Sequence, residues 1–175
     1  MRVFARRGLG GARHSEIAKE AGVSVPTVFF YFPTREALVK AVLDEVARFL
    51  TDMTVEIHAS RGPAPDIVLA HAKAFADSVD THPDHARVWL DWSTAIREEI
   101  WPRYLEFQEN VVGIIANTIR RWQRERGRSD EEAEDDARLI VGSAHMLAQM
   151  KFTRRAPEKL DHFMRTLVRS TLGNG

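Results

Sequence analysis

The side chains best suited to contact a charged partner lie close together in the sequence, between Ser24 and Arg35. Thr27 and Tyr31 carry hydroxyl groups and Arg35 carries a guanidinium group, and all three can donate hydrogen bonds to phosphate oxygens. Phe30 has no hydrogen-bonding group in its side chain and is restricted to apolar contacts, for example with the methyl group of thymine. Together these side chains are suited to contacting a nucleic acid.

The sequence lacks the patterns expected of a catalytic or metal-binding protein. It contains no cysteine, which excludes disulfides, a thiol nucleophile and cysteine-ligated zinc. The glycine-rich segment at residues 8–11 follows no strand and does not fit the dinucleotide-binding pattern. His82 and His85 flank Pro83 at a turn, with no third ligand at a suitable spacing. We therefore expect no enzyme activity, no cofactor and no metal.

The residues around Thr27 predict two short helices joined by a tight turn. The first helix covers residues 15–21, and Gly22 permits the left-handed conformation that the turn needs. Ser24 is suited to cap the second helix, over residues 25–32, whose first turn tolerates Pro26. The side chains expected to pack inside are Ile17, Ala18, Ala21, Val23, Phe29 and Phe32. This is the helix-turn-helix layout, whose second helix enters the major groove of DNA; an ordinary helical hairpin has similar spacing.

Three segments of the chain resemble the DNA-binding head of TetR-type transcriptional regulators. They are Phe4-Ala5-Arg6-Arg7-Gly8, Ile17-Ala18-x-x-Ala21-Gly22-Val23-Ser24 and Tyr31-Phe32-Pro33-Thr34-Arg35-Glu36-Ala37-Leu38. Residues 24–39 are also similar to the LuxR/HapR/SmcR branch, the quorum-sensing master regulators of vibrios. Two further motifs match that branch, Val88-Trp89-x-x-Trp92-Ser93 and Arg97-x-Glu99-x-Trp101-Pro102. The resemblance covers nearly the whole chain.

Two features depart from the pattern of these regulators. In the family the first helix begins well before Phe4, behind a basic arm, so we expect a head with a truncated first helix, through either a misassigned start or an incomplete head. Pro26 and Phe30 stand where the vibrio regulators carry alanine and asparagine. Because phenylalanine cannot form the hydrogen bonds of asparagine, the operator sequence of those regulators does not carry over.

The resemblance implies two kinds of DNA contact. Thr27, Tyr31 and Arg35 match positions that bind phosphate in the family, and such contacts set position rather than sequence. The residues expected to face the bases are Ser24, Val25, Pro26 and Phe30. The alternatives are partial burial for Tyr31 and a plain solvent-exposed charge for Arg35.

The charge distribution is uneven although the formal net charge is zero, with 25 basic and 25 acidic residues. Residues 1–35 hold six basic and two acidic residues, a net charge of +4, so the remaining 140 residues carry −4. A basic head on a mildly acidic body suits a protein that touches phosphate at one end only. The same asymmetry often arises by chance, so the charge distribution alone does not show that the head contacts phosphate.

Helical periodicity runs through nearly the whole chain, and no alternating strand pattern occurs, so we expect an all-α fold of about nine helices. Beyond the head, helices are expected near residues 34–57, 66–80, 84–94, 101–126, from 130 onward, and 157–172. The segment Arg61-Gly62-Pro63-Ala64-Pro65 predicts a boundary. It separates a helix-turn-helix DNA-binding domain over 1–57, including the connecting helix 34–57, from a regulatory and dimerisation domain over 63–175.

Several residues of the second domain are expected to line a ligand pocket. They are Phe75, Trp89, Trp92, Tyr104, Gln108 and Val112. An aromatic cavity with a few polar groups suits a small apolar ligand, and the resemblance implies a pocket between these helices. A filled core is the alternative, because aromatic residues at helical spacing most often pack in a core.

The last two helices carry apolar stripes beyond the needs of one core, which predicts a two-fold dimer interface. The interface residues expected are Ile140, Ala144, Leu147, Phe163 and Leu167. A head with a recognition helix of two turns makes too few contacts to bind DNA alone, so dimerisation is also required by the mechanism.

The sequence thus predicts a dimeric, sequence-specific transcriptional regulator of the TetR type that binds double-stranded DNA. No apolar run approaches the roughly 20 residues that span a bilayer, and no signal peptide is present, so we expect a cytoplasmic, nucleoid-associated bacterial protein that binds no membrane. The alternatives are a helical protein–protein interaction module without DNA binding, and a generic TetR-type repressor released by a small apolar ligand.

Overall fold

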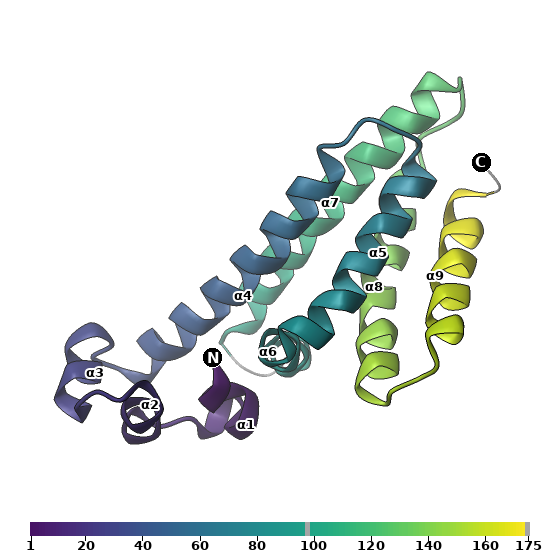
Figure 1. Ribbon diagram of the computed structural model, residues 1–175. Coiled ribbons are helices and arrows are strands. Elements are labelled where there is room, and N and C mark those ends of the chain that lie inside the picture. The colour runs from purple at the N-terminus through teal and green to yellow at the C-terminus, as the bar shows by residue number, and fades with distance from the viewer. Residues whose placement is uncertain (97–98, 174–175) are drawn as a thin grey trace. The chain divides into compact units, whose positions relative to one another are not determined.

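The computed structural model describes residues 1–96 and 99–173, and helices are the only regular elements within those residues (Figure 1). The helices are α1 (Arg2–Gly11), α2 (His14–Ala21), α3 (Val25–Tyr31), α4 (Arg35–His58), α5 (Ala64–Thr81), α6 (Pro83–Ser93), α7 (Trp101–Glu125), α8 (Ala133–Phe152) and α9 (Pro157–Leu172). The predicted all-helical fold is confirmed. Arg97, from one of the sequence motifs, and residues 174–175 lie outside the described residues.

The chain forms two compact units. The head unit comprises Met1–Phe49 and His82–Tyr104, and the body unit comprises Leu50–Thr81 and Leu105–Gly175. This division differs from the sequence boundary near residue 62, because α6 packs against α1 and therefore groups with the head. This long-range packing could not be predicted from the sequence, because neither helix carries a local pattern that identifies its partner.

The head unit is held together by a small apolar core and by bonds to the backbone of α1. Val3 and Phe4 of α1 are buried, and Gly8 interrupts the helix with a left-handed φ of 73°. Immediately after this kink, the Leu9 N–H donates to the Asp91 carboxylate of α6 at 2.6 Å. An added Cβ at Gly8 would lie 3.3 Å from the same carboxylate oxygen, so glycine serves both the backbone angle and the close approach.

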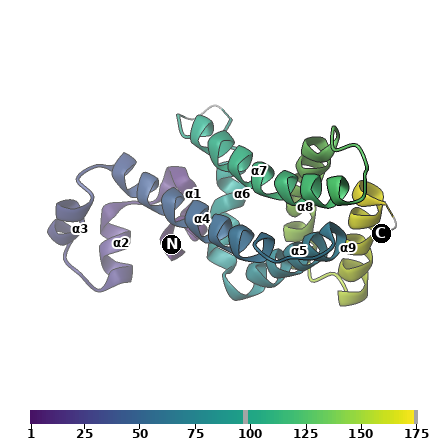
Figure 2. The same ribbon diagram turned by 90° about the horizontal axis from the view of Figure 1, so that it is seen from above.

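The core of the body unit is apolar and draws on four helices. Its buried members are Ala64, Val68, Val111, Val112, Ile115, Ala116, Ile119, Trp122, Ala133, Ala137, Ile140, Val168 and Leu172. Helices α5, α8 and α9 pack against one another and lie side by side in both views (Figures 1 and 2). This packing accounts for the apolar stripes seen on α7, α8 and α9.

A chain of hydrogen bonds crosses the otherwise apolar interior of the body unit. The His58 ring contacts the Thr118 hydroxyl at 2.9 Å and the His71 ring at 3.1 Å, and Thr54 lies 3.4 Å from the other nitrogen of His71. All four side chains are buried. Burial lowers the pKa of His58 to about 4 and that of His71 to about 3, so both rings are neutral at pH 7.

Among the described residues, none of the helices combines the length and the apolar character needed to cross a membrane.

Candidate DNA interface

The turn between α2 and α3 forms as its residues predict. Gly22 ends α2 in the left-handed conformation, with φ of 68°, and its N–H bonds to carbonyl oxygens of the last turn of α2. The Ser24 hydroxyl caps α3 by accepting the Thr27 N–H at 3.2 Å, and the two hydroxyl groups lie 2.7 Å apart. These local bonds fix the direction in which α3 leaves the turn.

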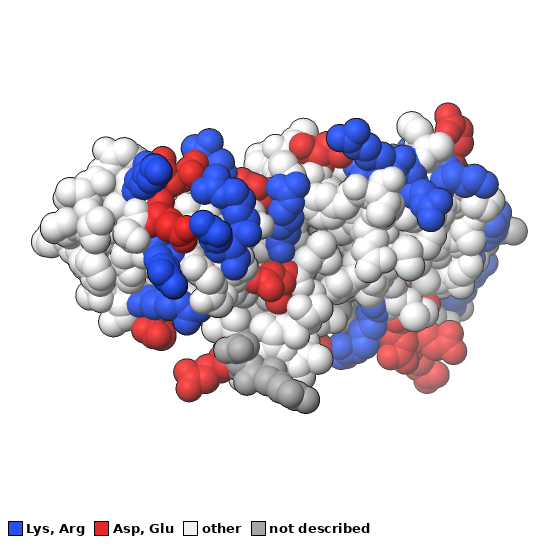
Figure 3. All heavy atoms as spheres, turned by 90° about the horizontal axis from the view of Figure 1, so that it is seen from below, with Lys and Arg blue, Asp and Glu red and all other residues white. Residues whose placement is uncertain are grey.

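Helix α3 presents an exposed face without any charged residue. Phe30 is 81 % exposed, and its ring meets the Tyr31 ring edge-on at 5.2 Å. The residues predicted to contact DNA are all exposed; they are Ser24, Val25, Pro26, Thr27, Phe30, Tyr31 and Arg35. In Figure 3 the surface at the α3 end of the head unit is accordingly white, whereas blue and red side chains alternate over the neighbouring surface. That these seven residues contact DNA is a prediction.

Three apolar residues that were expected in the interior lie at the surface. Val23 is 44 % exposed and Phe29 is 47 % exposed. The reason is the shortness of α3, a helix of seven residues in which only Val28 is buried, while Ala18 is the buried residue of α2. Ala21 is likewise exposed, while Ile17 and Phe32 are half-buried.

His14 holds α3 from the first turn of α2, a role the sequence analysis missed. Its ring stacks on Phe29 with centroids 4.0 Å apart and an interplanar angle of 4°. A ring nitrogen, Nε2, also donates to the Phe32 carbonyl oxygen at 2.8 Å, at the end of α3. His14 and Phe29 are far apart in the sequence and belong to no recognisable motif together, so only the structure reveals this contact.

Arg35 has a structural bond in addition to its predicted contact with phosphate. Its guanidinium donates to the Leu9 carbonyl oxygen at 2.7 Å, while the Leu9 N–H bonds to Asp91. Arg35 and Asp91 thus both bind the backbone of Leu9 in α1. A guanidinium has five N–H donors, so this bond leaves Arg35 able to donate to a phosphate as well.

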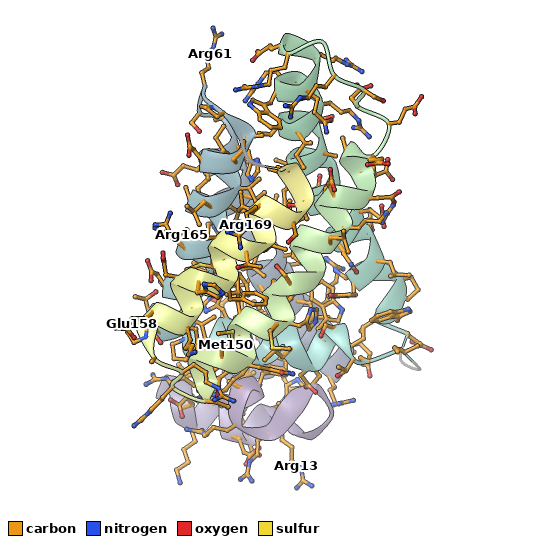
Figure 4. All side chains as sticks on the ribbon, turned by 90° about the vertical axis from the view of Figure 1, so that its right-hand side faces the viewer. Arg13, Arg61, Met150, Glu158, Arg165 and Arg169 are labelled. Atoms are coloured by element: carbon orange, nitrogen blue, oxygen red, sulfur yellow. The ribbon has the colours of Figure 1, made fainter. Side chains whose placement is uncertain are left out.

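Internal ion pairs reduce the positive charge that the head offers to DNA. Arg2 and Arg6 both pair with Glu20, and Arg7 pairs with Glu16. Arg13 and Lys19 are exposed and form no side-chain ion pair among the described residues, and Arg13 projects outward in Figure 4. These two cations are candidate phosphate contacts that the sequence analysis did not select.

The residues predicted to line one pocket are divided between the two units. Trp89, Trp92 and Tyr104 belong to the head unit, whereas Phe75, Gln108 and Val112 belong to the body unit. Val112 is part of the filled apolar core of the body.

The head unit contains an aromatic cluster around Tyr104. Its ring contacts Trp92 edge-on at 5.6 Å and stacks on Trp101 at 5.0 Å. Burial raises the pKa of Tyr104 to about 12, although a hydrogen bond with Ser93 acts in the opposite direction. The hydroxyl therefore stays protonated and can donate a hydrogen bond.

The predicted dimer residues divide into core and surface. Ile140 and Leu147 are buried within the protomer, Ile140 in the shared core, so neither offers its side chain to a second copy. Ala144, Phe163 and Leu167 are half-buried. The sequence analysis missed the neighbouring residues Leu139 and Met146, which are 62 % and 48 % exposed. The apolar period was read correctly, but α8 is rotated so that the adjacent stripe faces outward.

The arrangement of α2, the Gly22 turn and the capped α3 defines a helix-turn-helix DNA-binding protein. Residues 1–42 match the family of bacterial regulatory proteins described as the tetR family. The chain is also 37 % identical to the HTH-type transcriptional regulator LuxR of Vibrio harveyi over 153 residues, which cover 84 % of this chain and 72 % of that protein.

Solved structures share the fold. The transcriptional regulator FadR from Bacillus subtilis, in complex with stearoyl-CoA, matches with a TM-score of 0.77 and 16 % identity, covering 99 % of this chain and 95 % of that one. A tetR-family regulator from Streptomyces coelicolor matches with a TM-score of 0.71 and 22 % identity, covering 96 % and 72 %. The chain belongs to the TetR family and is a DNA-binding transcriptional regulator.

Proposed function

We propose that the protein binds operator DNA as a homodimer and reads base edges with the uncharged face of α3. The exposure of Phe30 beside the capped start of α3 is the observation that carries this proposal, because Phe30 lies on a short helix with the exposed apolar residues Val25 and Phe29, and a patch of exposed apolar residues marks an interaction site. Ser24, Val25 and Pro26 lie on the same exposed end. Thr27, Tyr31 and Arg35, joined by Arg13 and Lys19, supply the phosphate contacts.

Fluorescence anisotropy with promoter fragments tests this function. Binding should weaken steeply as salt rises, because phosphate contacts release counterions from DNA. A two-fold symmetric site should bind more tightly than a single half-site, since two heads then contact half-sites about one helical turn apart. Salt-independent binding, or equal affinity for the whole site and the half-site, would contradict the proposal.

The dimer interface is proposed on the exposed faces of α8 and α9. Leu139 and Met146 are separated by seven residues and therefore lie on one face of α8. Phe163 and Leu167 provide a half-buried apolar pair on α9. These residues replace Ile140 and Leu147, which the protomer's own core uses, as the proposed centre of the interface.

Control by a small apolar ligand is a second candidate function. The buried Tyr104 hydroxyl within the Trp92 and Trp101 cluster favours it, because such a group can orient a ligand that enters beside the rings. The complex of FadR from Bacillus subtilis with stearoyl-CoA supports testing long-chain acyl thioesters first. Adding stearoyl-CoA should change operator affinity by about 5- to 150-fold if the coupling is typical.

The relationship to LuxR of Vibrio harveyi supports a role in quorum-sensing control, exerted in the bacterial cytoplasm by binding rather than catalysis. Transcript levels measured at low and high cell density, with and without the gene, test this role. Genes that change only at one density support it, and identical changes at both densities contradict it.

A further inference from the structure

A groove in the body unit lies at the turn that joins α8 to α9. It encloses about 410 Å³ and is lined by Lys73, Ala76, Asp77, Asp80, Lys151, Arg154, Arg155, Pro157, Leu160 and Met164. In Figure 4 the labelled residues Met150 and Glu158 mark the ends of α8 and α9 at this turn. The volume is within the range of about 300–1,000 Å³ typical of small-molecule sites.

The charges that line the groove are not balanced. Lys151 pairs with Asp80, and Lys73 lies 3.7 Å from Asp161. The side chains of Arg154 and Arg155 form no ion pair or hydrogen bond among the described residues. Asp77 is the remaining carboxylate of the lining. Two guanidinium groups of the lining therefore outnumber Asp77, the one lining carboxylate without an ion-pair partner among the described residues, and this excess of positive charge favours an anionic ligand.

The backbone of the turn holds Arg154 in an unfavourable conformation. Its φ is 53°, in the left-handed region that residues with a side chain rarely adopt. The turn is fixed by the bond from the Arg154 N–H to the Lys151 carbonyl and by that from the Arg155 N–H to the Met150 carbonyl, both 3.0 Å. Glycine would relieve the strain, so an arginine here keeps a cation at the groove at a cost in stability.

Part of the lining of the groove is apolar. Ala76 comes from α5, and Leu160 and Met164 come from successive turns of α9. All three are buried. A ligand that contacts both the arginines and these apolar residues must combine an anionic group with an apolar part.

We propose that this groove is a binding site for a small amphiphilic anion, a carboxylate or a phosphate monoester on a short apolar chain. Arg154 and Arg155 hold the anionic group, since planar guanidinium groups match both carboxylate and phosphate. Leu160 and Met164 contact the chain. The site is separate from the aromatic cluster around Tyr104, which belongs to the head unit.

Isothermal titration calorimetry with four eight-carbon probes tests the site. Octanoate and octyl phosphate should bind at least about tenfold more tightly than octanol, because a charge-assisted hydrogen bond exceeds the 1.4 kcal/mol equivalent to a factor of ten. Octylamine, which has the opposite charge, should bind no better than octanol. The stronger of the two anions identifies the group preferred. Equal binding of anions and octanol would overturn the proposal.

Variants separate recognition from folding. Arg154→Gly removes the guanidinium and the strain together, so it should unfold at the same or a higher temperature and yet bind both anions about tenfold less tightly. Arg155→Gln should weaken both anions similarly. Arg61→Gln is the matched control, because Arg61 is another exposed arginine of the body unit, far from the turn in Figure 4, and should bind as the parent does. Unchanged affinity in Arg154→Gly and Arg155→Gln would refute the site.

Discussion

The proposed role of Phe30 is to set the sequence preference of the recognition helix. The ring is exposed, carries no donor or acceptor, and follows a helix start that is locked by Ser24 and Thr27. Such a ring discriminates through apolar contacts with base edges, most simply with thymine methyl groups. Asparagine at the same place would instead form paired hydrogen bonds with adenine.

Phe30→Asn should therefore change which operators are preferred, with about 1–3 kcal/mol of altered discrimination at the contacted base pair. A panel of operators with single base-pair changes, measured by anisotropy, checks this. The ranking of operators should differ from that of the parent, while average affinity changes little.

Arg13→Ala is the matched contrast, because Arg13 is an exposed cation of the head that forms no ion pair with any residue that the structure describes. It should weaken binding to every operator about equally and reduce the salt slope by about one unit. If both variants lowered affinity uniformly, Phe30 would be no more than a nonspecific contact.

The elements themselves were largely predictable because their ends carry local signals. Ser24 caps α3, Thr34 caps α4 through the Ala37 N–H at 3.1 Å, and Gly22 closes α2, each through atoms a few residues apart. The contacts of α1 were not predictable. Arg35 reaches Leu9 across 26 residues and Asp91 reaches it across 82, and no spacing rule connects such residues.

Gly8→Ala tests the attachment of α1. With φ of 73° and ψ of 168°, Gly8 adopts a conformation that is essentially restricted to glycine, and an added Cβ would also approach the Asp91 carboxylate, so we expect a loss of about 1–3 kcal/mol in unfolding free energy. Chemical denaturation followed by circular dichroism measures the loss. Gly10→Ala is the control, since its Cβ would make only an ordinary contact at 3.9 Å from Arg35. Equal unfolding free energies of the two variants would show that the kink at residue 8 does not require glycine.

At the scale of the whole molecule, the buried histidines tie stability to pH. The folded-state pKa values of His58 and His71 lie below the ordinary value of 6.5, so the unfolded chain binds more protons below that pH. Stability should therefore be complete above about pH 6.5 and fall as the pH drops toward 4, by up to about 2 kcal/mol for each ring at pH 5.

Urea denaturation at pH 7.5, 6 and 5 measures this dependence. His58→Gln removes one titrating ring and should flatten the pH dependence even if it lowers stability at pH 7.5. A slope identical to that of the parent would show that His58 does not contribute.

The surface proposed for dimerisation lies one residue along α8 from the one that periodicity alone predicted. The sequence indicated which helices carry extra apolar stripes, but the choice between Ile140 and Leu139 depends on the rotation of α8 against α5 and α9, which is set by tertiary packing. The same limit applies to the aromatic residues, whose convergence depends on the placement of whole helices.

Leu139→Arg should convert the proposed dimer into a monomer, because a desolvated charge at an apolar interface is costly. Light scattering after size-exclusion chromatography measures the mass, and operator affinity should fall with it. Leu105→Arg, at another exposed leucine of the body unit, should remain dimeric. If the Leu139→Arg protein were still a dimer, the interface would not include Leu139.

The neutrality of α3 has a consequence for how the regulator chooses among sites in a living cell. Its seven residues include none with a formal charge. If α3 reads the bases as proposed, dissolved ions compete only with the surrounding cations for the DNA phosphates, which are the same in every sequence, and leave the base contacts unchanged. When the salt concentration around the DNA rises, the fraction of protein bound to random DNA should decline, while the ratio of the affinities for a good and a poor operator should be preserved. Fewer operator sites are then occupied, but the preference for good operators over poor ones is unchanged.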